Sequence, residues 1–277
     1  MSYRVDVDSL KLIDSWPVPS AAAAVISASG EVLASRGDLE KSYALASVSK
    51  PIAAYAALAA IEEEAVTLET AVGVPGATVG NLLSHTSGVA FDSLQIVAKP
   101  GERRIYSNAG FELLAQTITE ATDIPFATYI QQALLEPLGM TGTDPNGPAA
   151  GMSSTVADLT RFAQELLNPE LLDPSTVEGA TVPVLGDLDG VLPGYGVQRP
   201  NQWGYGFEIR GKKSPHWTGS KNSPGTFGHF GQAGTFIWVD RANGLAVVAL
   251  TDRNFGKWAI EVWPAFSDAI ITEAGSS

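Results

Sequence analysis

Hydrophobic and polar positions follow different periods in different parts of the chain. Near the start, two short apolar runs at residues 22–27 and 31–35 flank a Ser-Gly pair, a pattern that predicts a β-hairpin. Further strand patterns return only near the end, at residues 205–210, 235–240 and 245–251. An Asn-Gly pair separates the last two of these runs and predicts a tight turn. Strands are therefore expected at both ends of the chain.

The middle of the chain carries helical spacing instead. Apolar residues recur at helical intervals between Phe111 and Ile118, with polar residues on the opposite face. The clearest amphipathic pattern lies at residues 159–167, and Thr155 and Asp158 precede it at capping-box spacing. These patterns predict two helices in the centre of the chain.

Weaker signals complete the pattern. We expect a short helix at residues 8–16, another at 125–137 that begins and ends at prolines, and a final helix at 262–274 with Pro264 in its first turn. Residues 168–202 are rich in proline and glycine and have little periodicity, so we expect long loops there.

Strands at both ends with helices between them indicate an α+β fold. The simplest architecture is an antiparallel sheet built from both chain termini and flanked by helices, with an inserted all-helical region. We expect residues 1–65 and 201–277 to form the sheet domain and residues 66–200 the helical domain, packed as one compact catalytic unit.

Composition narrows the possible functions. The formal net charge of −13 argues against a nucleic-acid partner and against anionic lipid. The chain has no cysteine, which excludes a thiol nucleophile, a disulfide framework and a Cys-ligated zinc. No apolar run reaches the length of a membrane span. If Met1 is the native start the protein is expected to be cytoplasmic; otherwise it is expected to be secreted with its leader removed.

Residues 51–61 are apolar on every side of the expected helix, which indicates a helix buried all round. Ser47 would sit at the start of this helix and Lys50 one turn later, so the hydroxyl and the amine would be neighbours. Such a pair could supply a nucleophile and its base beside the free N–H groups of a helix start. Alternatively, Ser47 is an ordinary N-cap and Lys50 a solvated side chain, since Ser-x-x-Lys occurs about once by chance in such a chain.

Two further segments suggest chemistry. Tyr106 and Asn108 form the only Tyr-x-Asn, and could be a proton shuttle and a hydrogen-bond donor, or an anchor and a helix N-cap. His229 and Gly231 form the only His-x-Gly, and could line a site or belong to an ordinary loop before a strand. Each signal alone is weak, but their joint occurrence in this order is improbable by chance.

In combination the motifs resemble the penicillin-recognising serine hydrolases, which comprise class C β-lactamases, D-alanyl-D-alanine carboxypeptidases, D-aminopeptidases and β-lactamase-like esterases. The resemblance covers residues 42–251, most of the chain, and is specific to the superfamily rather than to a substrate. The matching segments are Ser47-Val48-Ser49-Lys50, residues 82–88, Pro100-Gly101, Tyr106-Ser107-Asn108, residues 136–140, residues 153–162 and His229-Phe230-Gly231.

The resemblance implies a role for each matching residue. Ser47 would attack a carbonyl and form an acyl-enzyme, while Lys50 and Tyr106 would take its proton and pass it to the leaving group. Asn108 would orient Lys50 or the substrate. The backbone N–H groups of Ser47 and Gln232 would form the oxyanion hole, with Gln232 on the edge strand. No cofactor is implied, and with three histidines and no cysteine a metal site is not expected.

The departures from the family pattern bear on the substrate. Many members have Lys-Thr-Gly where this chain has His229-Phe230-Gly231, which weakens the groups that bind a substrate carboxylate. We therefore expect an esterase acting on small-molecule esters or amides, with Phe230 on the site wall. Four aromatic residues in the approach to this motif could line the acyl pocket or pack in the core: Trp203, Tyr205, Trp217 and Phe227.

Two other functions remain open from the sequence. One is a β-lactamase or a D-amino-acid peptidase, either a DD-carboxypeptidase or a D-aminopeptidase. The other is a penicillin-binding or sensor module that is acylated without turnover. The sequence does not define the oligomeric state.

Overall fold

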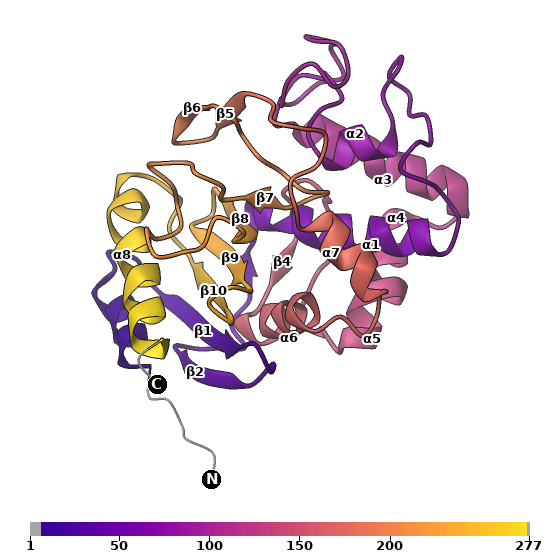
Figure 1. The fold of residues 1–277 in the computed structure, drawn as a ribbon. Helices are drawn as coiled ribbons and strands as arrows, with labels where there is room; N and C mark the ends of the chain where they lie inside the picture. Colours follow the sequence, from indigo (N-terminus) through magenta and orange to yellow (C-terminus); the bar gives the residue numbers. More distant parts are fainter. Residues whose placement is uncertain (1–6, 276–277) are drawn as a thin grey trace.

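The computed structural model describes residues 7–275. Its centre is a six-stranded antiparallel sheet with the strand order β2-β1-β10-β9-β8-β7 (Figure 1). The strands of this sheet are β1 (Ala21–Ser27), β2 (Val32–Arg36), β7 (Glu208–Ile209), β8 (Phe227–Gly231), β9 (Thr235–Asp240) and β10 (Leu245–Thr251).

The sheet joins the two ends of the chain, as predicted. The first strand, β1, pairs with the last, β10, in a register that runs from Ala21 opposite Thr251 to Ser27 opposite Leu245. The predicted hairpin is present as β1 and β2, and β9 and β10 have the predicted bounds. The strand expected at residues 205–210 is shorter, because only Glu208–Ile209 pairs with β8. The α+β class is confirmed.

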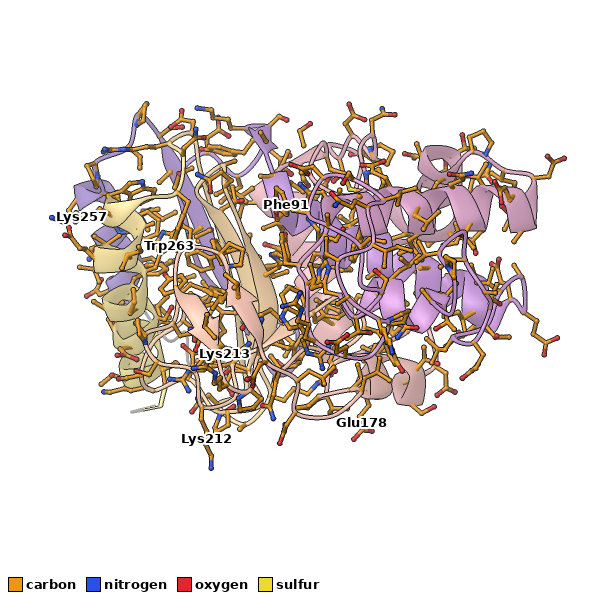
Figure 2. All side chains as sticks on the ribbon, turned by 90° about the horizontal axis from the view of Figure 1, so that it is seen from above. Phe91, Glu178, Lys212, Lys213, Lys257 and Trp263 are labelled. Carbon is orange, nitrogen blue, oxygen red and sulfur yellow. The ribbon has the colours of Figure 1, made fainter. Side chains whose placement is uncertain are left out.

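Alternate residues of each strand face opposite sides of the sheet, as the strand period requires. On β9, Phe236 and Trp238 pack in the cluster beneath α8 (Lys257–Ala274) and the 3-10 helix η1 (Asp8–Ser15). Ile237 and Val239 face the opposite cluster, which the helical region covers. Figure 2 shows this layering from above, with α8 on one side of the sheet and the helices from the middle of the chain across from it.

The remaining elements lie between β2 and β7 in sequence. They are β3 (Tyr43–Ala44), η2 (Ala46–Val48), α1 (Ser49–Glu62), α2 (Val79–Leu83), α3 (Asn108–Thr122), α4 (Phe126–Ile130), η3 (Gln131–Leu135), α5 (Glu136–Leu138), β4 (Ser153–Ser154), α6 (Val156–Leu167), α7 (Pro174–Ala180), β5 (Gly190–Leu192) and β6 (Gly196–Gln198). Among residues 7–275, no helix combines the length and apolar character needed to cross a membrane.

Helix α1 crosses the centre of the molecule. The residues from Ser49 to Ala60 are all buried, which confirms the prediction of a helix buried on every side. The helix begins two residues later than expected, however. Ser47 lies in the preceding 3-10 turn η2 rather than in the helix, because the chain reaches it through Ala46 in a left-handed conformation.

Several expected element boundaries were wrong. Helix α8 begins at Lys257, five residues before the predicted start, so Pro264 lies inside it. Residues 168–202 contain helix α7 and the β5–β6 hairpin, not only loops. The predicted helix at 125–137 continues through Pro137 and ends at Gly139, whose φ of +66° turns the chain away.

The N-caps of two central helices were partly anticipated. Thr155 caps α6 by accepting a hydrogen bond from the Asp158 amide, as predicted. The Asp158 carboxylate bonds the amide of Gly142 and the hydroxyl of Thr143 instead of completing a capping box. Ser107, not Asn108, caps α3, which leaves the Asn108 side chain free for another partner.

Candidate active site

The turn that carries Ser47 is held against the sheet. Ala46 has a φ of +46°, a region that residues with a Cβ rarely adopt. The carbonyl of Leu45 accepts a hydrogen bond of 2.8 Å from the Thr235 hydroxyl on β9, and the Leu45 amide donates to Met152 at 2.9 Å. These bonds fix the conformation that places Ser47 between the sheet and α1.

Lys50 is completely buried beneath Ser47. Its Nζ donates to Asn108 Oδ1 at 2.7 Å and to the Ala149 carbonyl at 2.8 Å, both neutral acceptors. Burial lowers the pKa of Lys50 from 10.5 to about 7, although the negative charges of Glu112 and Asp92 act in the opposite direction. A substantial fraction of this amine is therefore neutral near pH 7.

Tyr106 connects Ser47 with Lys50. The Ser47 side chain hydrogen-bonds Tyr106, and the Lys50 ammonium lies 4.6 Å from the centre of the Tyr106 ring. Burial raises the pKa of Tyr106, an effect that the bond to Ser47 only partly offsets. The phenol is thus protonated at neutral pH and can pass a proton only if another is supplied.

His229 points from β8 into the same region and is neutral. Its Nδ1 lies 2.6 Å from the Phe230 carbonyl, which only accepts hydrogen bonds, so Nδ1 carries the proton and Nε2 is an unprotonated acceptor. Nε2 is buried without a partner among residues 7–275. Burial, together with the nearby charge of Lys50, lowers the pKa of His229 to about 3.

The end of β8 packs directly on the Ser47 turn at Gly231. A Cβ at this position would lie 2.2 Å from the Leu45 carbonyl oxygen and 3.2 Å from the Ser47 nitrogen. Only glycine allows this close approach. Gln232 follows in the turn to β9, and β8 is not the edge strand, because β7 pairs with its first two residues. The His229–Gly231 end of β8 extends beyond that pairing.

These residues meet in one cavity of about 450 Å³ between the sheet and the helical region. Phe91, which is labelled in Figure 2, forms part of its wall together with Leu192 and Trp203. Six of the expected site residues line it directly: Ser47, Tyr106, Asn108, His229, Phe230 and Gln232. Lys50 and Gly231 lie immediately behind this surface.

Phe230 contributes less of the wall than expected. It is only 7% exposed, and its ring packs with Phe255 at 4.8 Å and with Trp217 at 5.9 Å in the cluster under α8. Of the four aromatic candidates for the acyl pocket, Trp203 lines the cavity. Trp217 and Phe227 are buried in the two core clusters, and Tyr205 packs against one of them.

Two groups at the site were missed by the sequence analysis. The His85 ring lies 4.6 Å from the rings of both Tyr106 and Trp203. His85 belongs to the matching segment 82–88, to which no role was assigned. Glu208 lines the cavity, but its carboxylate is already engaged. It pairs with Lys213, lies 3.0 Å from His216 Nε2 and accepts a hydrogen bond of 2.6 Å from the indole N–H of Trp217. No sequence motif marks either residue as part of a site. For Glu208, the only hint in the sequence is that an acidic residue stands within an apolar run.

The charge of Glu208 is stabilised by its partners. Burial opposes ionisation, but His216 and Lys213 outweigh it and lower the pKa of Glu208 to about 2. Burial also lowers the pKa of Lys213, yet its ammonium donates to three acceptors: Glu208 and the carbonyls of Gln202 and Ile209. Three acceptors match the three N–H bonds of the charged amine, so Lys213 and Glu208 form an ion pair.

The family model described as Beta-lactamase matches residues 14–265. The chain belongs to the beta-lactamase family. A crystal structure of a β-lactamase from Mycobacterium bovis is 53% identical to this family member and superimposes with a TM-score of 0.94. That match covers 96% of this chain and 99% of the other. This family member thus has the fold expected from its sequence.

More distant relatives widen the range of activities. A putative D-alanyl-D-alanine carboxypeptidase from Escherichia coli O157:H7 is 22% identical over 238 residues, covering 64% of this chain and 52% of that protein. The chain therefore spans about half the length of the curated relatives it matches. The structure of EstCE1, a hydrolase with promiscuous acyltransferase activity, is 17% identical with a TM-score of 0.77, covers 97% of each chain and shares the fold.

Proposed function

We propose that this protein is an esterase that cleaves carboxylic esters through an acyl-enzyme on Ser47. The Ser47 oxygen forms a bond to the ester carbonyl carbon, and its proton passes through Tyr106 to Lys50. Collapse of the tetrahedral intermediate breaks the bond to the alcohol, which takes up that proton. Water then attacks the acyl-enzyme and releases the acid and Ser47.

Lys50 suits the role of base because of what it contacts. A neutral amine has two N–H bonds and one lone pair. Asn108 and the Ala149 carbonyl accept two hydrogen bonds from Nζ, so the fourth tetrahedral position is open for a proton. The pKa of about 7 matches the pH at which such a base works best. Asn108 would thereby orient Lys50 as well as line the cavity.

The backbone amides of Ser47 and Gln232 are the proposed oxyanion hole. No hydrogen bond from either amide to another group is present among residues 7–275. Gly231 brings the end of β8 against the Ser47 turn, so the two amides flank one part of the cavity. Two preorganised N–H donors would stabilise the charge that develops on the carbonyl oxygen.

The observation that carries the choice of an ester is the charge of the cavity wall. Among residues 7–275, no lysine or arginine lines the cavity, and the one carboxylate that does, Glu208, is held in its own ion pair. His229 is neutral. A substrate carboxylate next to the reacting carbonyl would lose its hydration without gaining a cation. An uncharged ester would not incur this cost. His229 Nε2 offers such a substrate one acceptor, and Phe230 offers an apolar contact.

One observation favours a second candidate, hydrolysis of β-lactams. The Mycobacterium bovis relative, which is 53% identical, is described as a β-lactamase. The curated relatives named carboxypeptidases also extend the choice to D-amino-acid peptides. A penicillin-binding module that is acylated without turnover would use the same serine.

Assays with p-nitrophenyl butyrate, nitrocefin and D-amino-acid p-nitroanilides separate these functions. We expect sustained turnover of the butyrate and a much lower kcat/KM for the other two. Ser47→Ala should abolish turnover and labelling by a fluorophosphonate probe, while exposed Ser42→Ala should change neither. Faster hydrolysis of nitrocefin would favour the lactamase, and a stoichiometric burst without turnover would favour the binding module.

A further inference from the structure

A second groove opens from the cavity that contains Ser47. It has a volume of about 530 Å³ and shares Phe91, Tyr106 and Pro193 with the first cavity as lining residues. A molecule that reacts at Ser47 and is longer than the first cavity can therefore continue past Tyr106 into this groove. The ester hydrolysis proposed above does not use this groove.

Two segments distant in sequence form the walls of this groove. One is the β5–β6 hairpin, which carries Val191 and Val197, and the other is the loop before Tyr106, which carries Val97. The Arg104 amide donates to the Asp189 carbonyl at 2.9 Å and ties the loop to the hairpin. The three valines are 42–56% exposed, and an exposed apolar surface of this kind is typical of a binding site.

The groove also concentrates positive charge in an acidic protein. It is lined by Arg103, Arg104 and Arg199 but only one acid, Asp189, whereas the whole chain has 17 basic and 30 acidic residues. Arg199 pairs with Asp189 at 3.3 Å. Neither Arg103 nor Arg104 has a carboxylate within 4 Å among residues 7–275. Neither guanidinium is thus held in a close ion pair, although the charge of Asp187 acts on Arg104.

Arg104 itself is built into the wall. It is only 2% exposed and donates to the carbonyls of Ser84 and Val184, so these hydrogen-bond partners are neutral. Its Nε is buried without a partner in the part of the chain that the structure describes. A buried cation without a directly paired carboxylate raises the local potential and favours an anion nearby. Arg103, which is exposed at the rim, can contact that anion directly.

We propose, resting on the ester hydrolysis proposed above, that this groove holds an apolar arm of the substrate that ends in a carboxylate. The valines would contact the hydrocarbon part of the arm, and Arg103 would bind the carboxylate. Because Arg103 lines the groove and not the first cavity, this carboxylate does not conflict with the lack of cationic lining residues at Ser47. The arm could belong to the acyl group or to the alcohol of the ester, because both extend from the same carbonyl.

Two matched substrate pairs test the proposal. In the acyl pair, mono-p-nitrophenyl suberate is compared with p-nitrophenyl octanoate; in the alcohol pair, 8-acetoxyoctanoate is compared with octyl acetate in a pH-stat. We expect the carboxylate ester to have the higher kcat/KM in one of the two pairs, and the preference to shrink as salt screens the charge. Hydrolysis of p-nitrophenyl acetate reports separately whether the proposed esterase activity is present.

Substitutions connect the preference to the groove. Arg103→Gln should lower the ratio of carboxylate to neutral kcat/KM about three- to tenfold, the effect of one partly solvated charged hydrogen bond. Arg161→Gln on α6 removes an exposed arginine outside the groove and should leave the ratio unchanged. In the pair that shows the preference, Val197→Asn should lower kcat/KM for the neutral long-chain ester relative to p-nitrophenyl acetate about fivefold, whereas Val32→Asn on β2 should not. An active enzyme that shows no carboxylate preference in either pair, or equal ratios for Arg103→Gln and Arg161→Gln, overturns the proposal.

Discussion

His85 accepts hydrogen bonds from both backbone amides that flank Tyr106. The Ile105 amide donates to the His85 carbonyl at 2.8 Å, and the Ser107 amide donates to His85 Nδ1 at 3.1 Å. The His85 ring also packs 4.6 Å from the Tyr106 ring. His85 is buried and has a φ of +57°, a conformation that histidine and asparagine tolerate better than most residues. His85 is thus placed to fix the position of the Tyr106 phenol.

Two substitutions separate this positioning role from a purely structural one. His85→Asn keeps an acceptor close to the place of Nδ1 and tolerates the positive φ, whereas His85→Leu removes the acceptor. We expect His85→Leu to lower kcat about ten- to a hundredfold, because misplacing a catalytic group by about 1 Å has an effect of this size. His85→Asn should recover most of that loss, with KM similar in both variants.

The measurements are steady-state kinetics on p-nitrophenyl butyrate together with melting temperatures. If both variants lose the same kcat, or if kcat follows the melting temperature rather than the presence of an acceptor, His85 does not position Tyr106.

The pKa of Lys50 sets the expected pH dependence of catalysis. Burial lowers this pKa to about 7, and only the neutral amine accepts the Ser47 proton. The kcat/KM for esters should therefore rise as pH increases through about 7 and level off above it. Glu112 raises the pKa of Lys50 through its charge, so Glu112→Gln should shift the midpoint to lower pH.

Glu120→Gln provides the control for this shift, because Glu120 is an exposed acid on the same helix and does not act on Lys50. The role of Lys50 as base would be contradicted by a rate that is flat between pH 5.5 and 8.5.

Tyr106→Phe should lower kcat by about 10²- to 10⁴-fold with little change in melting temperature.

The close packing of Gly231 against the Ser47 turn allows the proposed oxyanion hole to be tested. Gly231→Ala would place a Cβ 2.2 Å from the Leu45 carbonyl oxygen, so the end of β8 and the Ser47 turn must move apart. This movement should separate the Ser47 and Gln232 amides, and losing one donor typically lowers kcat by about 10²- to 10³-fold. Gly179→Ala in α7 meets no atom within 4 Å and serves as the control. Unchanged kcat in folded Gly231→Ala would exclude this geometry.

Local patterns were sufficient to predict the strands of the two terminal hairpins, β1–β2 and β9–β10, but not β8, for which no strand was predicted. The short apolar runs of β9 and β10, and the Asn-Gly pair between them, are local features of the sequence, and these two strands have the predicted bounds. Helix α1 was predictable for the same reason, since an apolar run without a polar face has one explanation. Helix α7 was missed although Asp173 and Pro174 stand at its N-cap and first position, because proline and glycine dominate the surrounding segment.

The site was less predictable where its contacts are long-range. The motif and the family resemblance pointed to Ser47, Lys50 and Tyr106, and the structure brings these three together. The partner of Lys50 at Ala149 is 99 residues away and contributes only a backbone carbonyl, which no side-chain pattern can reveal. The two hydrogen bonds that His85 accepts likewise depend on a turn that places residue 85 beside residues 105 and 107.

The buried cluster around Glu208 predicts a stability effect. Glu208→Gln removes the carboxylate that pairs with Lys213 and accepts from His216, leaving a buried cation unpaired. Breaking a buried pair in this way typically costs about 3–5 kcal/mol of unfolding free energy. In the unaltered protein, the pKa of Glu208 falls from 4.5 to about 2 on folding, so its contribution is complete above about pH 5 and is lost as pH falls towards 2.

Urea unfolding at pH 7 and pH 3.5 checks both statements. The difference in stability between the unaltered protein and Glu208→Gln should be larger at pH 7. Glu170→Gln, on an exposed acid remote from this cluster, should unfold close to the unaltered protein. An equal difference at both pH values would show that Glu208 is not stabilised by its charge.

The last prediction concerns Phe230 and the choice between esters and lactams. An aromatic ring offers no hydrogen bond to the carboxylate next to a lactam, so the unaltered enzyme should prefer p-nitrophenyl butyrate to nitrocefin by kcat/KM. Phe230→Thr adds a hydroxyl at the cavity wall and should move the ratio towards nitrocefin. One donor to a charged group contributes about 1.5–3 kcal/mol, so the shift should be about ten- to a hundredfold or less.

The packing of Phe230 requires a matched control for this comparison. Its ring fills space between Phe255 and Trp217, and removing a buried phenylalanine side chain typically costs about 3–5 kcal/mol of stability. Phe230→Leu loses the ring but adds no hydroxyl, so it measures the effect of altered packing alone. Because a loss of folded enzyme lowers both rates together, the ratio of the two kcat/KM values isolates the hydroxyl. If Thr and Leu change that ratio equally, or if the unaltered enzyme prefers nitrocefin, Phe230 does not determine the substrate class.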